Sequence, residues 1–256
     1  MELTWMQKER FYRDGYLLTP GVVPQVMVDA ALRAINHSLG EGLPAEQIIT
    51  MRSQSYCKEI QNTPVIADLY NKTPALALAE SLVGAGKIKP VEAGQIALRF
   101  PSLSDPPSPP RPHLDGMYTP TNGVPEGTIQ NFTMLLGVLL SDLRAPYAGN
   151  FTVWPGTHHQ YERYFQEHSP QSLLNGMPLI DLPEPTFITG NAGDVVLVHY
   201  ELAHAASLNV SPHVRYAIFF RLTHCDHSAQ KWESMTDIWL EYEGMREVVA
   251  AALARR

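Results

Sequence analysis

Beyond Gly86 the chain consists of short apolar segments separated by glycine, proline and asparagine. Many short strands with frequent turns are typical of a β-sandwich or a closed barrel, because each strand reaches its partners through tight connections. The segment 132–140 is almost wholly apolar, which indicates a central strand. We expect the remaining strands at residues 95–100, 150–154, 186–189, 194–200, 204–209 and 214–223.

The part of the chain before residue 90 is predicted to be mainly helical. Residues 3–14 are amphipathic and stop at Gly15, and residues 16–18 look like a brief strand. Pro24 suits the first turn of a helix that ends near Gly40, and two further helices are expected at 64–71 and 74–83. We therefore expect one domain over 1–256, with a helical part at 1–90, a β core at 91–225 and a C-terminal helix at 226–256.

Composition narrows the classes of partner. Apolar residues make up 45% of the chain, the net charge is −7 and the basic residues are not clustered, so nucleic acid and anionic membranes are not expected partners. Cys57 and Cys225 form no CxxC pair, and no apolar run is long enough for a membrane span. We expect a cytoplasmic protein that acts on a small molecule; its oligomeric state is left open.

The chain contains two His-x-Asp motifs, at His113–Asp115 and at His224–Asp226, and the related His199-x-Glu201. Residues i and i+2 of an extended segment point to the same side, so either pair could reach one metal ion. Two histidines and one carboxylate form a facial triad, which holds Fe(II) and leaves coordination sites open. A triad also requires a later histidine, and after His224–Asp226 only His227 remains.

His204 differs from the other histidines in its spacing to an arginine. Of the ten histidines, His204 alone has an arginine eleven residues later, at Arg215. Arg215 lies within the apolar run 214–223, where a buried charge requires a partner, and a planar guanidinium suits a carboxylate. We expect residues 202–209 and 214–222 to be strands joined by a turn at 210–212, which returns Arg215 to the level of His204.

The ordered set of motifs resembles the phytanoyl-CoA dioxygenase family. The set comprises the opening FYRDGYL at 11–17, His113-x-Asp115, GNFTVWPGTH at 149–158, GDVVLVH at 193–199, and His204 followed by Arg215. The resemblance covers essentially the whole chain. It implies a double-stranded β-helix, or jelly roll, mainly β with flanking helices.

The resemblance also implies a chemistry. Fe(II) would bind His113, Asp115 and His204, 2-oxoglutarate would pair its distal carboxylate with Arg215, and O2 would be consumed. The expected activity is that of an Fe(II)- and 2-oxoglutarate-dependent dioxygenase, which oxidises an unactivated C–H bond and releases succinate and CO2. Halogenating relatives replace the carboxylate ligand with a small residue, so Asp115 favours hydroxylation or desaturation over halogenation. Further candidates for contact with 2-oxoglutarate are Gln95, Arg99, Asn131, Thr133, Trp154 and Ser207.

Several features of the chain permit more than one interpretation. The proline-rich segment 101–112 is either a stiff connector or part of a lid, and the loop 117–127 is the first candidate for substrate contacts. The motif at 155–158 is expected to form a tight turn. An acyl-CoA substrate would favour a basic patch, for which only Lys87 and Lys89 are suggested. A jelly-roll metalloenzyme independent of 2-oxoglutarate, or a non-catalytic binding protein on the same fold, are the alternative functions.

Overall fold

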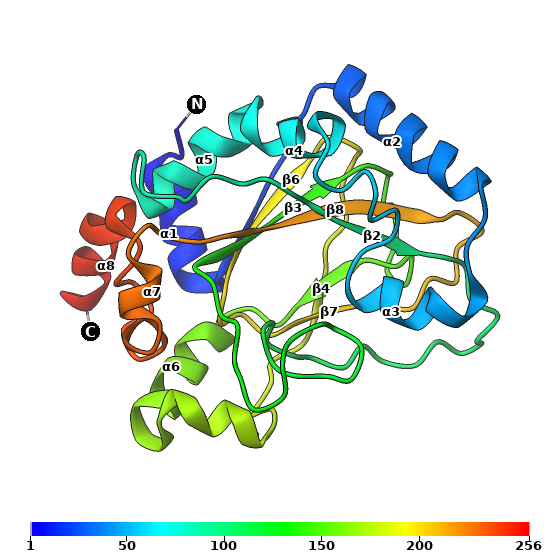
Figure 1. The fold of residues 1–256 in the computed structure, drawn as a ribbon. Coiled ribbons are helices and arrows are strands. Elements are labelled where there is room, and N and C mark those ends of the chain that lie inside the picture. Colours follow the sequence, from blue (N-terminus) through cyan, green and yellow to red (C-terminus); the bar gives the residue numbers. More distant parts are fainter. Residues whose placement is uncertain (1, 256) are drawn as a thin grey trace.

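The computed structural model describes residues 2–255 and consists of two antiparallel sheets with helices on the outside (Figure 1). The large sheet has the strand order β1-β6-β3-β8-β2, and the small sheet has the order β5-β4-β7. The strands are β1 (Tyr16–Thr19), β2 (Gln95–Arg99), β3 (Met134–Leu139), β4 (Phe151–Val153), β5 (Thr186–Phe187), β6 (Val195–His199), β7 (His204–Ala206) and β8 (Arg215–Leu222). All strands lie within the segments predicted from the sequence, apart from one residue at the end of β1.

Helices cover the outer face of the large sheet, as Figure 1 shows for α2, α4 and α5. The helices are α1 (Trp5–Asp14), α2 (Gln25–Gly40), α3 (Ile48–Ser53), α4 (Pro64–Asn71), α5 (Pro74–Val83), α6 (Thr157–His168), α7 (His227–Gln230) and α8 (Arg246–Leu253). Gly15 ends α1 in the left-handed conformation, as its sequence position suggested. Within residues 2–255 no helix has the length and apolarity that crossing a bilayer requires.

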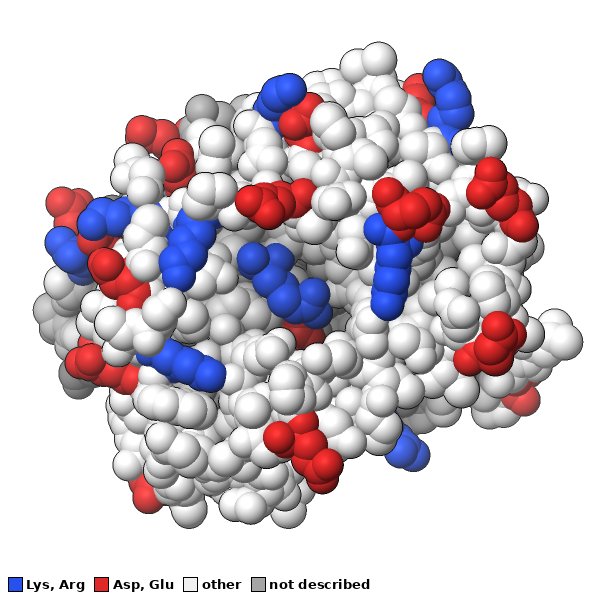
Figure 2. All heavy atoms as spheres, in the orientation of Figure 1, with Lys and Arg blue, Asp and Glu red and all other residues white. Residues whose placement is uncertain are grey.

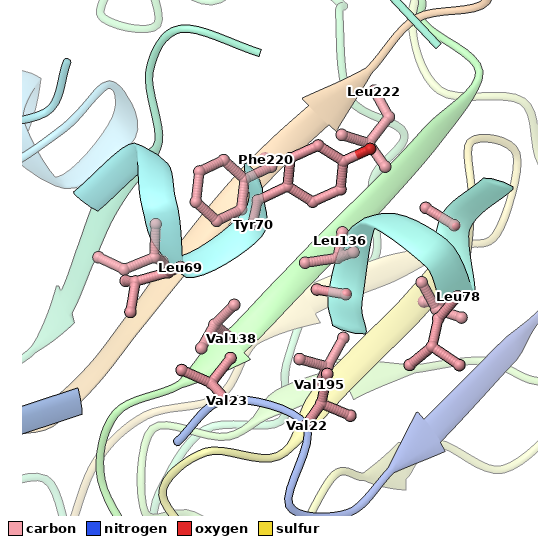
Figure 3. Close-up of a cluster of buried hydrophobic side chains, with 14 of the residues drawn as sticks. Val22, Val23, Leu69, Tyr70, Leu78, Leu136, Val138, Val195, Phe220 and Leu222 are labelled. Carbon is pink, nitrogen blue, oxygen red and sulfur yellow. The ribbon is translucent and has the colours of Figure 1, made fainter. Parts of the chain in front are cut away.

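Successive side chains of β8 point alternately into two separate hydrophobic clusters. Ile218, Phe220 and Leu222 face the helices, where they pack with the side chains shown in Figure 3. Ala217 and Phe219 face the small sheet instead and belong to the inner cluster. Each fully buried side chain of this size contributes about 2 kcal/mol to folding, so this pattern fixes which face of β8 is turned inward.

The inward face also carries the charged residues of β8. Side chains two apart share a face, so Arg215 and Arg221 lie on the same side as Phe219. The neighbouring strand β2 matches this arrangement, with Gln95 opposite Phe219 and Arg99 opposite Arg215 in the antiparallel register. The two strands therefore present a polar floor between the sheets.

The turn at 210–212 joins two strands that belong to different sheets. β7 pairs with β4 in the small sheet, whereas β8 pairs with β2 and β3 in the large sheet. The expected return of Arg215 to the level of His204 therefore takes place across the two sheets, and both residues line one cavity. The turn carries the chain from one sheet to the other, so that His204 and Arg215 lie on opposing walls.

The prediction of one continuous C-terminal helix is wrong. The segment contains α7, two 3-10 turns (Glu233–Met235 and Glu243–Met245) and the short α8. Met235 packs in the inner cluster, whereas Tyr242 and Met245 pack in the outer one. One straight helix could not place these side chains in both clusters, and the segment is accordingly divided into short helical turns.

Candidate active site

His113 and His204 are placed side by side by a pair of backbone hydrogen bonds. The His113 N–H donates to the His204 carbonyl at 2.9 Å, and the His204 N–H donates to the His113 carbonyl at 3.1 Å. Residues directly opposite in an antiparallel pair point to the same face with Cβ atoms about 5 Å apart. The ring centroids accordingly lie 4.6 Å apart. Two ligands that are distant in the sequence thus become neighbours.

Asp115 completes the cluster. Its Oδ1 lies 3.5 Å from Nε2 of His113 and 3.5 Å from Nε2 of His204. Among residues 2–255 this is the one group of three His, Cys, Asp or Glu side chains whose ligand atoms lie within 4.8 Å of one another. Two imidazole nitrogens and one carboxylate oxygen are a donor set suited to Fe(II).

Hydrogen bonds prepare these donors for a metal. The Nδ1–H of His204 donates to the Leu202 carbonyl at 2.9 Å, so the lone pair of a neutral ring lies on Nε2, beside Asp115. The Tyr200 hydroxyl donates to the Asp115 carbonyl at 3.0 Å and fixes the backbone at that residue. Both contacts orient ligands without using the atoms that would bind the ion.

Arg221 holds the other oxygen of Asp115. Its Nη2 lies 2.8 Å from Asp115 Oδ2, and its Nη1 donates to Gln95 Oε1 at 2.9 Å. Burial by itself would raise the pKa of Asp115. The positive charge of Arg221 is the largest opposing influence, and the pKa of Asp115 lies well below its usual value. Asp115 is therefore an anion, the form that binds metal.

Arg215 is buried without an acidic partner. It is only 2% exposed, and its Nε and Nη1 donate to the carbonyls of Gly149 (2.7 Å) and Ala97 (3.0 Å). Burial, and then the charge of Arg99, lower its pKa well below the ordinary value. Among the described residues no carboxylate pairs with it, so its remaining N–H groups are available to an anion.

Gly149 allows the two arginines to lie together. A Cβ at this position would be 2.8 Å from the Arg99 Cβ and 3.1 Å from the Arg215 Cβ, and its φ of +75° disfavours any other residue. The glycine was part of the motif noted in the sequence. Its physical role there is to leave room for paired arginine side chains.

These groups share one cavity of about 890 Å³ between the sheets. Figure 2 shows the corresponding hollow near the centre of one face, with blue atoms in and beside it, a small red area at its floor and further red groups around its rim. The cavity is lined by the three candidate metal ligands, Arg215, Gln95, and seven residues of the loop 117–127, which was expected to contact substrate. None of the lining residues comes from the proline-rich segment 101–112.

Four other candidates lie outside the cavity lining that the structure describes. Asn131 donates to the Lys231 carbonyl at 2.7 Å, and the hydroxyl of Thr133 donates to Glu241, so both tie the C-terminal segment to β3. Trp154 is buried in the inner cluster, and Ser207 donates to the Leu208 carbonyl at 3.1 Å. Their contact with 2-oxoglutarate stays a prediction.

In the other histidine motifs, imidazole nitrogens form hydrogen bonds with the backbone. His199 Nδ1 accepts from the Glu201 N–H at 3.0 Å, and its Nε2 donates to the Ile238 carbonyl at 3.0 Å. His224 Nδ1 accepts from the Asp226 N–H at 3.1 Å, and neither residue lines the cavity. His158 lies at the start of α6, directly after the turn at 155–156, and its Nε2 donates to the Tyr12 carbonyl at 2.9 Å.

Sequence reasoning did not identify Arg221 as a site residue. The signal was present, because Arg221 lies six residues after Arg215 and therefore on the same face of one strand. The approach of Arg221 to Asp115 depends on a loop that no local pattern describes. Arg52, on α3, also lines the cavity, and no local sequence pattern indicated that it would.

Comparisons with known proteins agree with this geometry. The family model described as phytanoyl-CoA dioxygenase (PhyH) matches residues 11–217, well over half of the chain. The chain belongs to the phytanoyl-CoA dioxygenase family. The resemblance inferred from the motifs and the expected mainly β, cupin-like jelly roll are thereby confirmed. No curated protein sequence is significantly similar to it.

Solved structures of similar fold include HygX from Streptomyces hygroscopicus, with nickel and 2-oxoglutarate bound. It is 20% identical, with a TM-score of 0.58, over 87% of this chain and 88% of that one. EctD from S. alaskensis, with 2-oxoglutarate and 5-hydroxyectoine, is 20% identical with a TM-score of 0.58, over 86% and 76% of the two chains. The epimerase SnoN, in complex with Fe3+, alpha ketoglutarate and nogalamycin RO, is 19% identical with a TM-score of 0.56, over 85% and 82%.

Proposed function

We propose that this protein is an Fe(II)- and 2-oxoglutarate-dependent oxygenase that oxidises an unactivated C–H bond of a small molecule. One observation carries the proposal. A His-Asp-His cluster and a buried arginine without an acidic partner line the same cavity. A metal ion and a dicarboxylate are the ligands that these two features accept.

His113, Asp115 and His204 would hold the iron. The donor set fits Fe(II), and His204 already presents its Nε2 toward Asp115. When bound, iron and 2-oxoglutarate together supply the oxidising chemistry: O2 is consumed, 2-oxoglutarate becomes succinate and CO2, and one oxygen atom is available to the substrate. The role of the chain is to place these reactants and to exclude water from them.

Arg215 would bind the distal carboxylate of 2-oxoglutarate. A buried guanidinium without a counter-ion is unfavourable, and a bound carboxylate removes that cost while giving two parallel hydrogen bonds. Proteins of the same fold, HygX and EctD, hold 2-oxoglutarate in their structures, which supports this assignment. Gln95 lines the cavity and is a second candidate contact.

The fold is compatible with more than one outcome of the oxidation. The relatives SnoN and SnoK are an epimerase and a carbocyclase, respectively. The carboxylate of Asp115 occupies the position that halogenating relatives leave open, which favours hydroxylation, desaturation or a related C–H oxidation. The alternatives are a metalloenzyme that does not use 2-oxoglutarate and a non-catalytic binding protein.

An anaerobic titration tests the proposal. Fe(II) and then 2-oxoglutarate are added to metal-free protein, and the weak visible charge-transfer band of the iron chelate is recorded. We expect the band in the wild type, its loss in His113→Ala, and a much higher 2-oxoglutarate requirement in Arg215→Leu. Arg33→Leu is the matched control, because Arg33 is exposed on α2 and does not line the cavity.

Each negative result has a defined meaning. Stoichiometric iron binding without the band would favour the enzyme that is independent of 2-oxoglutarate. Failure to bind Fe(II) would favour the non-catalytic protein. An unaltered 2-oxoglutarate requirement in Arg215→Leu would remove Arg215 from its proposed role.

A further inference from the structure

The cavity carries far more positive charge than its proposed ligands neutralise. Its described lining includes five cationic side chains and one acid, Asp115, an excess of four positive charges. The five are Arg52, Lys58, Arg99, Arg215 and Arg221. Bound Fe(II) and the dianion of 2-oxoglutarate cancel each other, so the excess would remain in the loaded site.

Most of these cations lack an acidic partner. Within residues 2–255 Arg221 is the one cavity cation in an ion pair, with Asp115 at 2.8 Å. Lys58 donates to the Gln54 side chain at 2.6 Å, and Arg99 donates to the carbonyl of the preceding residue, Leu98, at 3.0 Å. In a chain whose net charge is −7, this local excess is not a consequence of composition.

The segment after α3 brings Arg52 to the cavity. The Tyr56 N–H donates to the Ile96 carbonyl at 2.9 Å, and the Ile96 N–H donates to the Ser55 hydroxyl at 3.0 Å. These bonds fasten the segment to β2, the edge strand of the large sheet. Arg52, in the last turn of α3, is therefore followed within three residues by a segment that is hydrogen-bonded to β2, and not by a free loop.

Three arginines form a continuous row, which we call the arginine row: Arg215, Arg99 and Arg52. Arg215 is buried, Arg99 is half-buried directly opposite it in the β-sheet register, and Arg52 is exposed. Burial, and then the charge of Arg52, lower the pKa of Arg99. The row thus leads from the interior to the mouth, and its adjacent like charges repel one another.

The proposed co-substrate satisfies only one end of the row. The distal carboxylate of 2-oxoglutarate has one negative charge, and Arg215 alone matches it. We infer that the substrate itself is an anion, and that Arg52 and Arg99 receive its carboxylate or phosphate group at the mouth of the cavity. This inference rests on the proposed function for the occupancy of Arg215 by 2-oxoglutarate.

Apolar side chains in the cavity lining indicate the rest of the substrate. Leu114, Met117, Phe151 and Phe219 provide an apolar surface near the candidate metal ligands. A molecule with an apolar body and one anionic group would place the body against these side chains and the charge on Arg52 and Arg99. The basic patch that the sequence suggested at Lys87 and Lys89 is not part of the described lining.

Matched probes test this inference by calorimetry. Phenylacetate and phenylacetamide have the same skeleton and differ in charge, and phenyl phosphate distinguishes the two kinds of anion. Each is titrated into metal-free protein and into protein saturated with Ni(II) and 2-oxoglutarate, which blocks Arg215. The variants are Arg52→Leu, Arg52→Lys and the control Arg33→Leu.

We expect at least one anion to bind more tightly than the amide in both states. Arg52→Leu should weaken the Kd of that anion about fivefold, the size expected for a partly exposed ion pair. Arg52→Lys and Arg33→Leu should stay close to the wild type, and the tighter anion identifies the class of the group. The Kd of 2-oxoglutarate should be unchanged in Arg52→Leu.

Three results would overturn the inference. The amide could bind as tightly as both anions, or anion binding could be unaffected by Arg52→Leu. The third is a loss of 2-oxoglutarate affinity in Arg52→Leu like that in Arg215→Leu. The last would assign Arg52 to the co-substrate site. Failure of the proposed function is distinguishable, because 2-oxoglutarate would then not bind the Ni(II)-loaded wild type. In that case the comparison in metal-free protein still decides the charge preference.

Discussion

Replacement of Arg221 by leucine should weaken metal binding. Its guanidinium holds Oδ2 of Asp115 at 2.8 Å and Gln95 at 2.9 Å, while Oδ1 of Asp115 is directed at both histidines. Without Arg221 the carboxylate can rotate, so the three donors are no longer preorganised. Loss of a contact that orients a metal ligand weakens metal affinity about 10- to 100-fold, and the 41% exposure of this side chain favours the lower end, about tenfold.

A second effect has the opposite sign. Arg221 is a cation near the ion, so its removal also reduces repulsion of the metal. Solvent screens that repulsion at a partly exposed side chain, and we expect the loss of orientation to dominate. Arg221→Lys separates the two effects, because it keeps the charge but not the two-pronged contact with Asp115 and Gln95.

The assay is an anaerobic Fe(II) titration against a chromophoric chelator, with thermal unfolding of the metal-free variants as a check on folding. Arg221→Leu and Arg221→Lys should both lose affinity, while Arg33→Leu should not. If Arg221→Leu bound Fe(II) as tightly as the wild type or more tightly, the orientation argument would be refuted.

Three further predictions concern the surroundings of the site. Gly149→Ala should lower the free energy of unfolding by about 2 kcal/mol and raise the 2-oxoglutarate requirement, because the new Cβ meets Arg99 and Arg215; normal values in denaturant and binding titrations would contradict this. Glu201 is fully buried and its pKa is raised well above the usual value, so the wild type should lose stability as pH rises above about 4.5, where the unfolded carboxyl ionises. Glu201→Gln should therefore gain stability relative to the wild type between about pH 5 and pH 8. If the urea midpoints of the wild type and the variant changed with pH in parallel, this prediction would be contradicted. Burial lowers the pKa of His199 to about 4, so acidification from about pH 6.5 toward 4 should lower the free energy of unfolding by about 3 kcal/mol. In His199→Gln the free energy of unfolding, measured with urea in the same way, should depend less on pH over this range.

The positions of most elements could be predicted because their signals are local. Alternation and turn residues located the strands, and Gly15 and Pro24 marked helix boundaries. The helix α6 was missed, because its polar and aromatic residues do not form a clear apolar stripe. The C-terminal segment was predicted wrongly, since its apolar residues serve two different clusters.

The candidate site was predictable to a limited depth. His113, Asp115, His204 and Arg215 were found from order and spacing, and the structure brings all four to one cavity. The contact of the further candidates Asn131 and Thr133 with 2-oxoglutarate stays a prediction. Both are polar residues on or beside a core strand, and only the structure shows that they bind the C-terminal segment.

The sequence by itself determined the family, the jelly-roll class and the candidate metal-binding triad, because these depend on residue types in a fixed order along the chain. Tertiary structure decided which groups surround that triad. The contact between Arg221 and Asp115, the alignment of Arg99 with Arg215 and the attachment of Ser55, just after α3, to β2 join segments that are distant in sequence. Sheet register and loop path set such contacts, and neither can be deduced from the residues at the contact alone.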